Sequence, residues 1–157
     1  MKYVFFVIGI VILGGILFLG MKDRGVTQEA QEEMLEEKPV AVINGIEIEL
    51  DVVRTPEEQT RGLSGRESLE ANTGMLFVYE TPAIPGFWMK EMNFPIDIIW
   101  IDENKKIIDI TENLVPETFP QVFYPHSQIL YVLEVNAGWA KNHNASMDDT
   151  VEFDIDF

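Results

Sequence analysis

Two acidic side chains stand inside apolar segments, where an unpaired charge is costly. Asp97 lies in the run Ile96–Ile101, and Glu134 ends the run Leu130–Glu134. A carboxylate on a core-facing position must be paired and hydrogen-bonded, because losing its hydration is otherwise strongly unfavourable. Two carboxyl groups in different surroundings also supply a general acid and a general base. These two residues are therefore the first candidates for chemistry.

Basic side chains are scarce in this part of the chain, and three of them stand in segments whose resemblance to a known family is described below. They are Arg61, Arg66 and Lys90. We predict that Asp97 and Glu134 each meet some of these three cations. One interpretation is a structural ion-pair network that fixes a short helix onto a sheet.

The other interpretation is a ligand pocket, in which the two carboxylates, Lys90 and Trp88 face a bound molecule. An aromatic wall beside carboxylates suits sugar binding, and pairs of carboxyl groups are the working groups of many glycosidases. The candidate ligand-binding residues are thus Arg61, Arg66, Trp88, Lys90, Asp97 and Glu134. Both interpretations stay open at this point.

Other kinds of chemistry find little support. His126 and His143 are isolated from other ligands at zinc-binding spacing, and the chain has no cysteine. No glycine-rich phosphate loop and no nucleophile elbow is present. We therefore predict no metal and no cofactor, and a binding role is favoured over an enzymatic one.

The charge of the chain limits its partners. The formal net charge is −16, and from Val40 onward seven Lys and Arg stand against twenty-one Asp and Glu, which gives −14. Binding to a phosphate backbone requires a basic face, so we exclude nucleic acid as a partner.

The first residues predict a membrane anchor. Residues 3–21 contain no charge and no proline. At about 1.5 Å per residue, a helix of this length crosses the hydrocarbon core of a bilayer. A cleaved signal peptide is the alternative, but the run exceeds the usual apolar region of about 7–15 residues and no small-residue cleavage site follows it. Residues 1–21 are thus expected to be a transmembrane anchor.

The flanks of this segment carry nearly equal positive charge, so they do not fix its orientation. An N-terminal anchor with a very short leading segment usually sends the following domain across the membrane. We expect a single-pass cell-membrane protein whose domain lies outside the cytoplasm. Residues 22–39, rich in Glu and Gln, form an acidic linker to that domain.

From residue 40 to 157 the pattern is mainly that of strands. Val40–Ile43 and the alternating run Ile46–Val52 flank Asn44-Gly45, which suits a type I′ hairpin turn. Thr55-Pro56 then begins a short helix, with threonine as the cap. The later short apolar runs predict a compact antiparallel β-sandwich or partly open barrel with one short helix. Residues 114–127 are expected to form a long irregular loop.

Five segments occur in a fixed order along the chain: Gln59–Arg66, Gly74–Phe77, Phe87–Lys90, Pro95–Ile99 and Val132–Gly138. Together they resemble the DUF192 family, a bacterial and archaeal domain of unknown function. The likeness extends over nearly all of residues 46–157. It implies a compact β-rich fold with a short helix and no assigned activity. At 91–93 this chain has Glu-Met-Asn, where the family more often has Asn-Thr and an aliphatic residue, so a ligand role of Lys90 through that motif is weakened.

The sequence thus favours a membrane-anchored extracytoplasmic domain that binds a cell-envelope component such as a glycan. A hydrolase using Asp97 and Glu134 is the first alternative. The second is a structural or assembly module, in which the aromatic side chains of the loop, Phe119, Phe123 and Tyr124, contact a protein partner.

Overall fold

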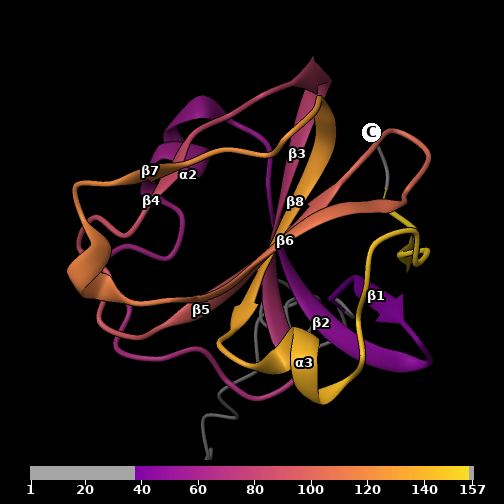
Figure 1. The fold of residues 1–157 in the computed structure, drawn as a ribbon, viewed down its shortest axis with the longest axis horizontal. Helices are drawn as coiled ribbons and strands as arrows, with labels where there is room; N and C mark the ends of the chain where they lie inside the picture. Colours follow the sequence, from indigo (N-terminus) through magenta and orange to yellow (C-terminus); the bar gives the residue numbers. More distant parts are fainter. Residues whose placement is uncertain (1–37, 156–157) are drawn as a thin grey trace, which may run out of the picture. The chain divides into compact units, whose positions relative to one another are not determined.

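The computed structural model describes residues 38–155. Strands dominate this part, which confirms the prediction of a mainly β domain (Figure 1). The expected anchor lies outside the described residues, and so does the linker up to residue 37. No helix within residues 38–155 is long and apolar enough to cross a membrane. The elements are β1 (Val40–Ile43), β2 (Ile46–Val53), α2 (Pro56–Arg61), β3 (Thr73–Ala83), β4 (Phe87–Trp88), β5 (Ile96–Ile101), β6 (Ile107–Leu114), η1 (Pro116–Thr118), β7 (Val122–Phe123), β8 (Ile129–Asn136), α3 (Trp139–Asn142) and β9 (Glu152–Phe153).

The hairpin and the helix begin where the sequence predicts them. Asn44 and Gly45 both have positive φ, at 53° and 78°, as a type I′ turn requires. Thr55 caps α2 by accepting a hydrogen bond from the Glu58 N–H, while the Glu58 carboxylate accepts from the Thr55 N–H at 3.0 Å. This reciprocal capping box fixes the start of the helix.

One strand pair departs from the antiparallel prediction. β2 and β3 run parallel, with Glu49 opposite Thr73 and Val53 opposite Phe77. The reason is α2, because the helix and the loop after it carry the chain back to the starting end of β2. A parallel pair needs such a crossover, whereas a tight turn produces an antiparallel one. The other pairs of the large sheet are antiparallel.

The large sheet has the order β6-β5-β8-β3-β2-β1-β9 and curls into a half-barrel (Figure 1). The curl brings the start of β6 to the segment before β9. The Asp148 N–H donates to the Ile107 carbonyl at 2.8 Å, and Lys106 forms a bridge with Thr150. Of the two predicted architectures, the partly open barrel is therefore the one observed.

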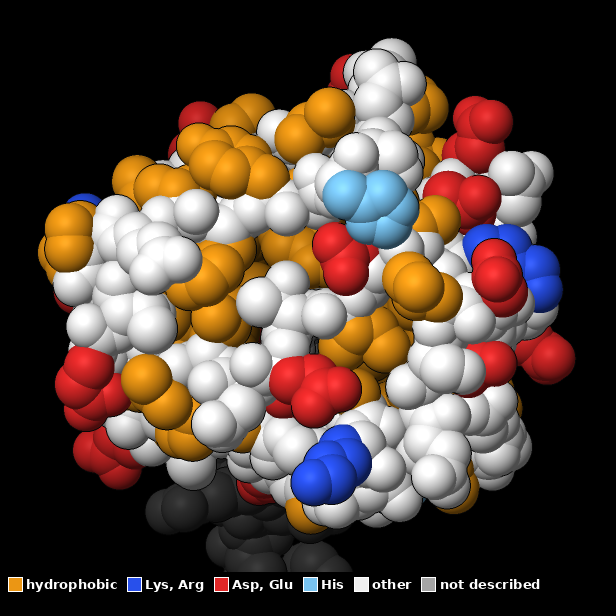
Figure 2. Space-filling view, viewed as in Figure 1, with side chains coloured by type: hydrophobic (Ala, Val, Ile, Leu, Met, Phe, Trp, Pro, Cys, Tyr) orange, Lys and Arg blue, Asp and Glu red, His pale blue; other side chains and the backbone are white. Residues whose placement is uncertain are grey.

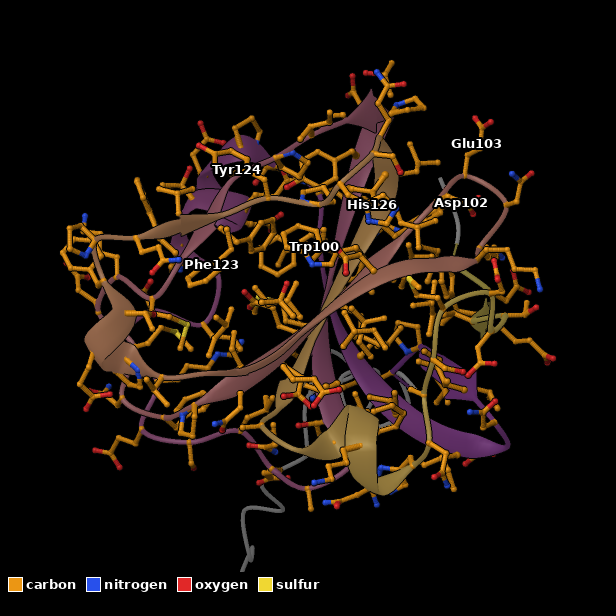
Figure 3. The ribbon with its side chains drawn as sticks, viewed as in Figure 1. Trp100, Asp102, Glu103, Phe123, Tyr124 and His126 are labelled. Carbon is orange, nitrogen blue, oxygen red and sulfur yellow. The ribbon has the colours of Figure 1, made fainter. Side chains whose placement is uncertain are left out.

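The loop expected at 114–127 is more ordered than the sequence suggests. It contains η1 and β7, and β7 pairs with β4 to form a separate two-stranded ribbon. Phe87 lies opposite Phe123 in this ribbon, and Trp100 lies in the interior beneath it (Figure 3). The short apolar segment Val122–Phe123 gave no strand signal because two residues are too few for an alternating pattern.

The curled sheet carries a separate hydrophobic core on each face. We call the first the α3 core, because it includes Trp139 of α3, and the second the ribbon core, because it includes Phe87 of β4. In β5, odd-numbered side chains enter the α3 core and even-numbered ones enter the ribbon core, as the alternation of a strand requires. The buried β5 and β8 members are Ile99, Ile101, Tyr131, Leu133 and Val135 in the α3 core, and Ile96, Ile98, Trp100, Ile129 and Val132 in the ribbon core.

Replacing Gly74 with alanine is expected to destabilise the domain by roughly 1–3 kcal/mol, the usual effect of overpacking. A Cβ atom there would lie 2.9 Å from the Glu134 carbonyl oxygen and 2.9 Å from Leu133 Cδ1. The carbonyl belongs to the paired strand β8 and has little room to move. Thermal unfolding of the full-length chain measures the loss, with Ser68→Ala at an exposed position as the control. An unchanged midpoint for Gly74→Ala would contradict the close packing of β3 on β8.

Candidate functional site

Asp97 and Glu134 lie on neighbouring strands but on opposite faces of the sheet. In the β5–β8 register, Asp97 is opposite Val135 and Ile98 is opposite Glu134. Side chains of directly opposed residues share a face, and successive residues alternate between faces. Asp97 therefore points to the α3 core and Glu134 to the ribbon core. The expectation that the two carboxylates face one ligand is wrong.

Asp97 binds backbone groups instead of cations. Its side chain is fully buried, with Oδ1 accepting from the Asn113 N–H at 2.8 Å and Oδ2 from the Ala140 N–H at 3.0 Å. None of the ion pairs among residues 38–155 includes Asp97, so the predicted pairing with Arg61, Arg66 or Lys90 does not occur there. Asp97 thus has a structural role, because it joins the end of β6 and the start of α3 to β5.

Glu134 is buried without such partners. Its side chain is 6% exposed, and Oε2 has no hydrogen-bond partner among the described residues. Burial raises the pKa of Glu134 to about 8, and the positive charge of Arg66 acts in the opposite direction. Near neutral pH the group is thus mainly a protonated carboxylic acid, which both donates and accepts a hydrogen bond.

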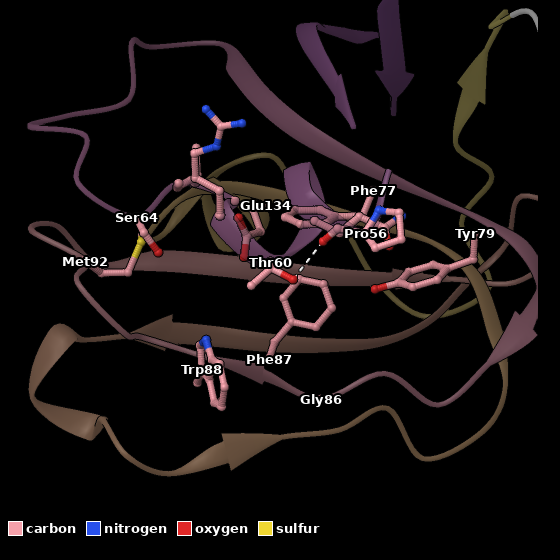
Figure 4. Close-up of a pocket in the computed structure, with 14 residues that line it drawn as sticks. Pro56, Thr60, Ser64, Phe77, Tyr79, Gly86, Phe87, Trp88, Met92 and Glu134 are labelled. Atoms are coloured by element: carbon pink, nitrogen blue, oxygen red, sulfur yellow. Dashed lines mark hydrogen bonds between the residues drawn. The ribbon is translucent and has the colours of Figure 1, made fainter. Parts of the chain in front are cut away.

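The Glu134 carboxyl group faces a pocket of about 370 Å³ between α2 and β4 (Figure 4). β3 contributes Phe77 and Tyr79 to it, and the Tyr79 hydroxyl points inward (Figure 4). Burial, and to a smaller degree the charge of Glu134, raise the pKa of Tyr79 to about 12, so its hydroxyl stays protonated. The lining is Pro56, Gln59, Thr60, Arg61, Gly62, Leu63, Ser64, Phe77, Tyr79, Gly86, Phe87, Trp88, Met92 and Glu134.

The β4–β7 ribbon supplies the aromatic side of this pocket. Phe87 points inward, where it packs edge-to-face on Phe77 at 4.9 Å and on Trp100 at 5.3 Å between ring centroids. Trp88, the next residue, therefore faces the other way and is 48% exposed. The neighbouring Gly86 has no room for a side chain, because a Cβ atom would lie 2.7 Å from Val122 Cγ1. The ribbon is thus closely packed on its inner side, while the indole ring of Trp88 on its other side is exposed to solvent.

The three predicted cations take different positions. Arg61, at the last residue of α2, lines the pocket. Arg66 lies near enough to influence Glu134 but forms its ion pair with Asp51 at 2.8 Å. Lys90 is on the surface, 3.9 Å from Glu91, and is not part of the lining. The structure therefore brings Arg61, Trp88 and Glu134 together, with Arg66 beside them.

Several lining residues were not found from the sequence. Tyr79 is the most informative, because it follows Phe77 by two positions in β3 and so shares its face. That alternation was visible in the sequence, but nothing in it placed the end of β3 beside β8. Gln59 and Thr60 of α2 and Ser64 of the following turn line the pocket because of how this segment packs against the sheet, which local patterns do not specify. Among residues 38–155, no group of three or more His, Asp or Glu side chains is placed to hold a metal ion.

Comparisons with known proteins agree with this fold. Residues 40–153 match the DUF192 family, described as "Uncharacterized ACR". A crystal structure of a protein of unknown function from Novosphingobium aromaticivorans DSM 12444 is 32% identical, with a TM-score of 0.69 over 73% of this chain and 83% of that one. No curated protein matches the chain.

A second solved structure extends the likeness to a protein that carries a functional name. This protein, from Sinorhizobium meliloti 1021, is described as a candidate transcription regulator. It is 28% identical, with a TM-score of 0.70 over 74% of this chain and 92% of that one. The family match covers most of the chain, and the solved structures share the fold of the described domain. The chain belongs to the DUF192 family.

Proposed function

We propose that this domain binds a small polar ligand with a flat apolar face, namely a sugar residue of a cell-envelope glycan, in the Glu134 pocket. The observation that carries the proposal is the buried carboxyl group of Glu134, which lines the pocket and has an oxygen without a hydrogen-bond partner. A buried polar atom without a partner is unfavourable, and a ligand hydroxyl would satisfy it.

The remaining lining fits the same class of ligand. The exposed Trp88 ring offers a flat surface, while Tyr79 offers a hydroxyl group at the side. Ligand pockets generally combine apolar walls with a few convergent polar groups and measure about 300–1,000 Å³. At about 370 Å³ this pocket suits one or two sugar rings.

The hydrolase alternative finds less support. Glycosidases place two carboxyl groups on either side of the bond that they cleave. Among the lining residues Glu134 is the one carboxylic acid, and the Asp97 side chain points to the opposite face of the sheet. A binding role needs no second carboxylate, so it accounts for the site with fewer groups.

We further propose that residues 3–21 anchor the domain to the cell membrane, outside the cytoplasm. The support is the length and uncharged character of this segment together with the polar linker that follows it. The regulator named among the related structures suggests nucleic-acid binding, but the strongly acidic composition argues against that role here.

Trp88→Ala is expected to weaken sugar binding at least tenfold, because the stacking surface is lost. Tryptophan fluorescence of the full-length chain measures binding, since Trp100 and Trp139 are buried and Trp88 is the exposed one of the three. The Trp88→Ala variant lacks this fluorescent side chain, so NMR titration with methyl glycosides measures sugar binding in the variant. Phe119→Ala is the matched control, because Phe119 is 46% exposed and outside the pocket lining. If no methyl glycoside binds the unmodified chain, the proposal is wrong.

A further inference from the structure

Arg61 stands at the junction of two hollows. It lines the Glu134 pocket and also an adjoining groove of about 360 Å³, and Gly62 and Ser64 are shared in the same way. Arg66 and Glu58 also line that groove, although neither lines the pocket. A ligand in the pocket thus has the Arg61 guanidinium group next to it, on the side where the groove begins.

The guanidinium group of Arg61 is available to a ligand. None of the ion pairs among residues 38–155 includes it, although this part of the chain is rich in carboxylates (Figure 2). Hydrogen bonds from the N–H groups of Thr55 at 3.0 Å and Arg54 at 3.1 Å to the Glu58 carboxylate lower the pKa of Glu58, and the charge of Arg61 is the smallest of the several causes that lower it. Other basic side chains are engaged, such as Lys38 with Glu49 at 2.8 Å.

Glu134 does not oppose an anion in this pocket. Burial keeps its carboxyl group protonated near neutral pH, so it adds no negative charge and donates a hydrogen bond. The lining of the pocket then holds one full charge, the positive charge of Arg61. In an otherwise acidic chain, this local reversal of sign favours a negatively charged ligand group.

We infer that the ligand is an acidic sugar, of the uronic-acid class, whose ring lies against Trp88 and whose carboxylate is bound by Arg61 at the mouth of the groove. A planar guanidinium group matches a carboxylate through two parallel hydrogen bonds, which gives the contact both strength and direction. The inference rests on the proposed function, because it names the class of sugar for the same pocket.

The test compares methyl β-D-glucuronide with methyl β-D-glucoside, which differ in a carboxylate at C6. NMR titration of the full-length chain is expected to give at least tenfold tighter binding of the glucuronide. In Arg61→Gln this preference should fall to about one. Lys90→Gln is the matched control, because it removes a neighbouring charge outside the lining and should keep the preference. Arg61 is exposed at the end of α2, and a thermal melt verifies that its variant folds.

The outcomes separate the inference from the proposed function. Equal binding of the two glycosides, or a preference that persists in Arg61→Gln, would overturn the acidic-sugar inference and leave sugar binding intact. Absence of binding by both would overturn the two together. A competition experiment with sodium acetate completes the test. If acetate displaced the glucuronide at equal concentration, the carboxylate alone would be recognised and not the sugar ring, which would also overturn the inference.

Discussion

Asp97→Ala is expected to lower the free energy of unfolding by roughly 3–6 kcal/mol, since hydrogen bonds to a charged acceptor contribute about 1.5–3 kcal/mol each. The change leaves the N–H groups of Asn113 and Ala140 without their acceptors. Domains of this kind have a total stability of about 5–15 kcal/mol, so this loss is a large share of the total and should shift the unfolding midpoint strongly. Urea denaturation of the full-length chain, followed by far-ultraviolet circular dichroism, measures the shift.

Two further variants make this result specific. Asp97→Asn retains one acceptor oxygen but turns an amide NH₂ toward the other N–H donor, so an intermediate loss is expected. Glu112→Gln changes an exposed carboxylate on β6 and should shift the stability by less than about 0.5 kcal/mol. If Asp97→Ala unfolded at the same urea concentration as the unmodified chain, the structural role assigned to Asp97 would be wrong.

The second large effect is the pH dependence that Glu134 imposes on stability. Its folded-state pKa of about 8 lies above the ordinary glutamate value of 4.5 that applies to the unfolded chain. Between these values the folded chain holds a proton that the unfolded chain has released. The contribution to stability is therefore fully present below about pH 4.5 and is lost as the pH rises toward 8. At about 1.4 kcal/mol per pH unit, the loss is about 4–5 kcal/mol.

Glu134→Gln isolates this contribution. Glutamine has nearly the same shape and does not ionise, so the variant should match the unmodified chain near pH 5 and exceed its stability near pH 9. Urea denaturation at both pH values measures the difference in unfolding free energy between the variant and the unmodified chain. Other titrating groups contribute equally to both chains, so their effect cancels in this difference. Glu80→Gln, an exposed position on β3, should show no such divergence. A constant difference between the chain and Glu134→Gln from pH 5 to pH 9 would contradict the raised pKa.

Short sequence patterns were sufficient to predict the turns, the helix start and individual strands. Asn44-Gly45 marked the hairpin, Thr55-Pro56 marked the helix, and the apolar run Ile96–Ile101 is β5 without any shift of its bounds. The burial of Asp97 and Glu134 also follows from their apolar neighbours. Each of these features depends on residues within a few positions of one another.

The relation between the two carboxylates could not be predicted in the same way. Whether Asp97 and Glu134 share a face depends on the register of β5 against β8, and a shift of one residue reverses the answer. The partners of Asp97 are likewise backbone groups from distant segments, which no pattern of side chains reveals. The parallel pairing of β2 with β3 depends in turn on the path of the chain after α2.

The way the half-barrel closes has a consequence for its synthesis. β1 pairs with β9, so Ala41 meets Phe153 from opposite ends of the described residues, and β6 meets the segment just before β9. On the ribosome, both of these edges stay open until β9 and the segment before it have emerged. Unpaired strand edges are templates for association with other chains. The nascent domain is thus most exposed to aggregation just before β9 emerges, when nearly all of its core residues have already been made.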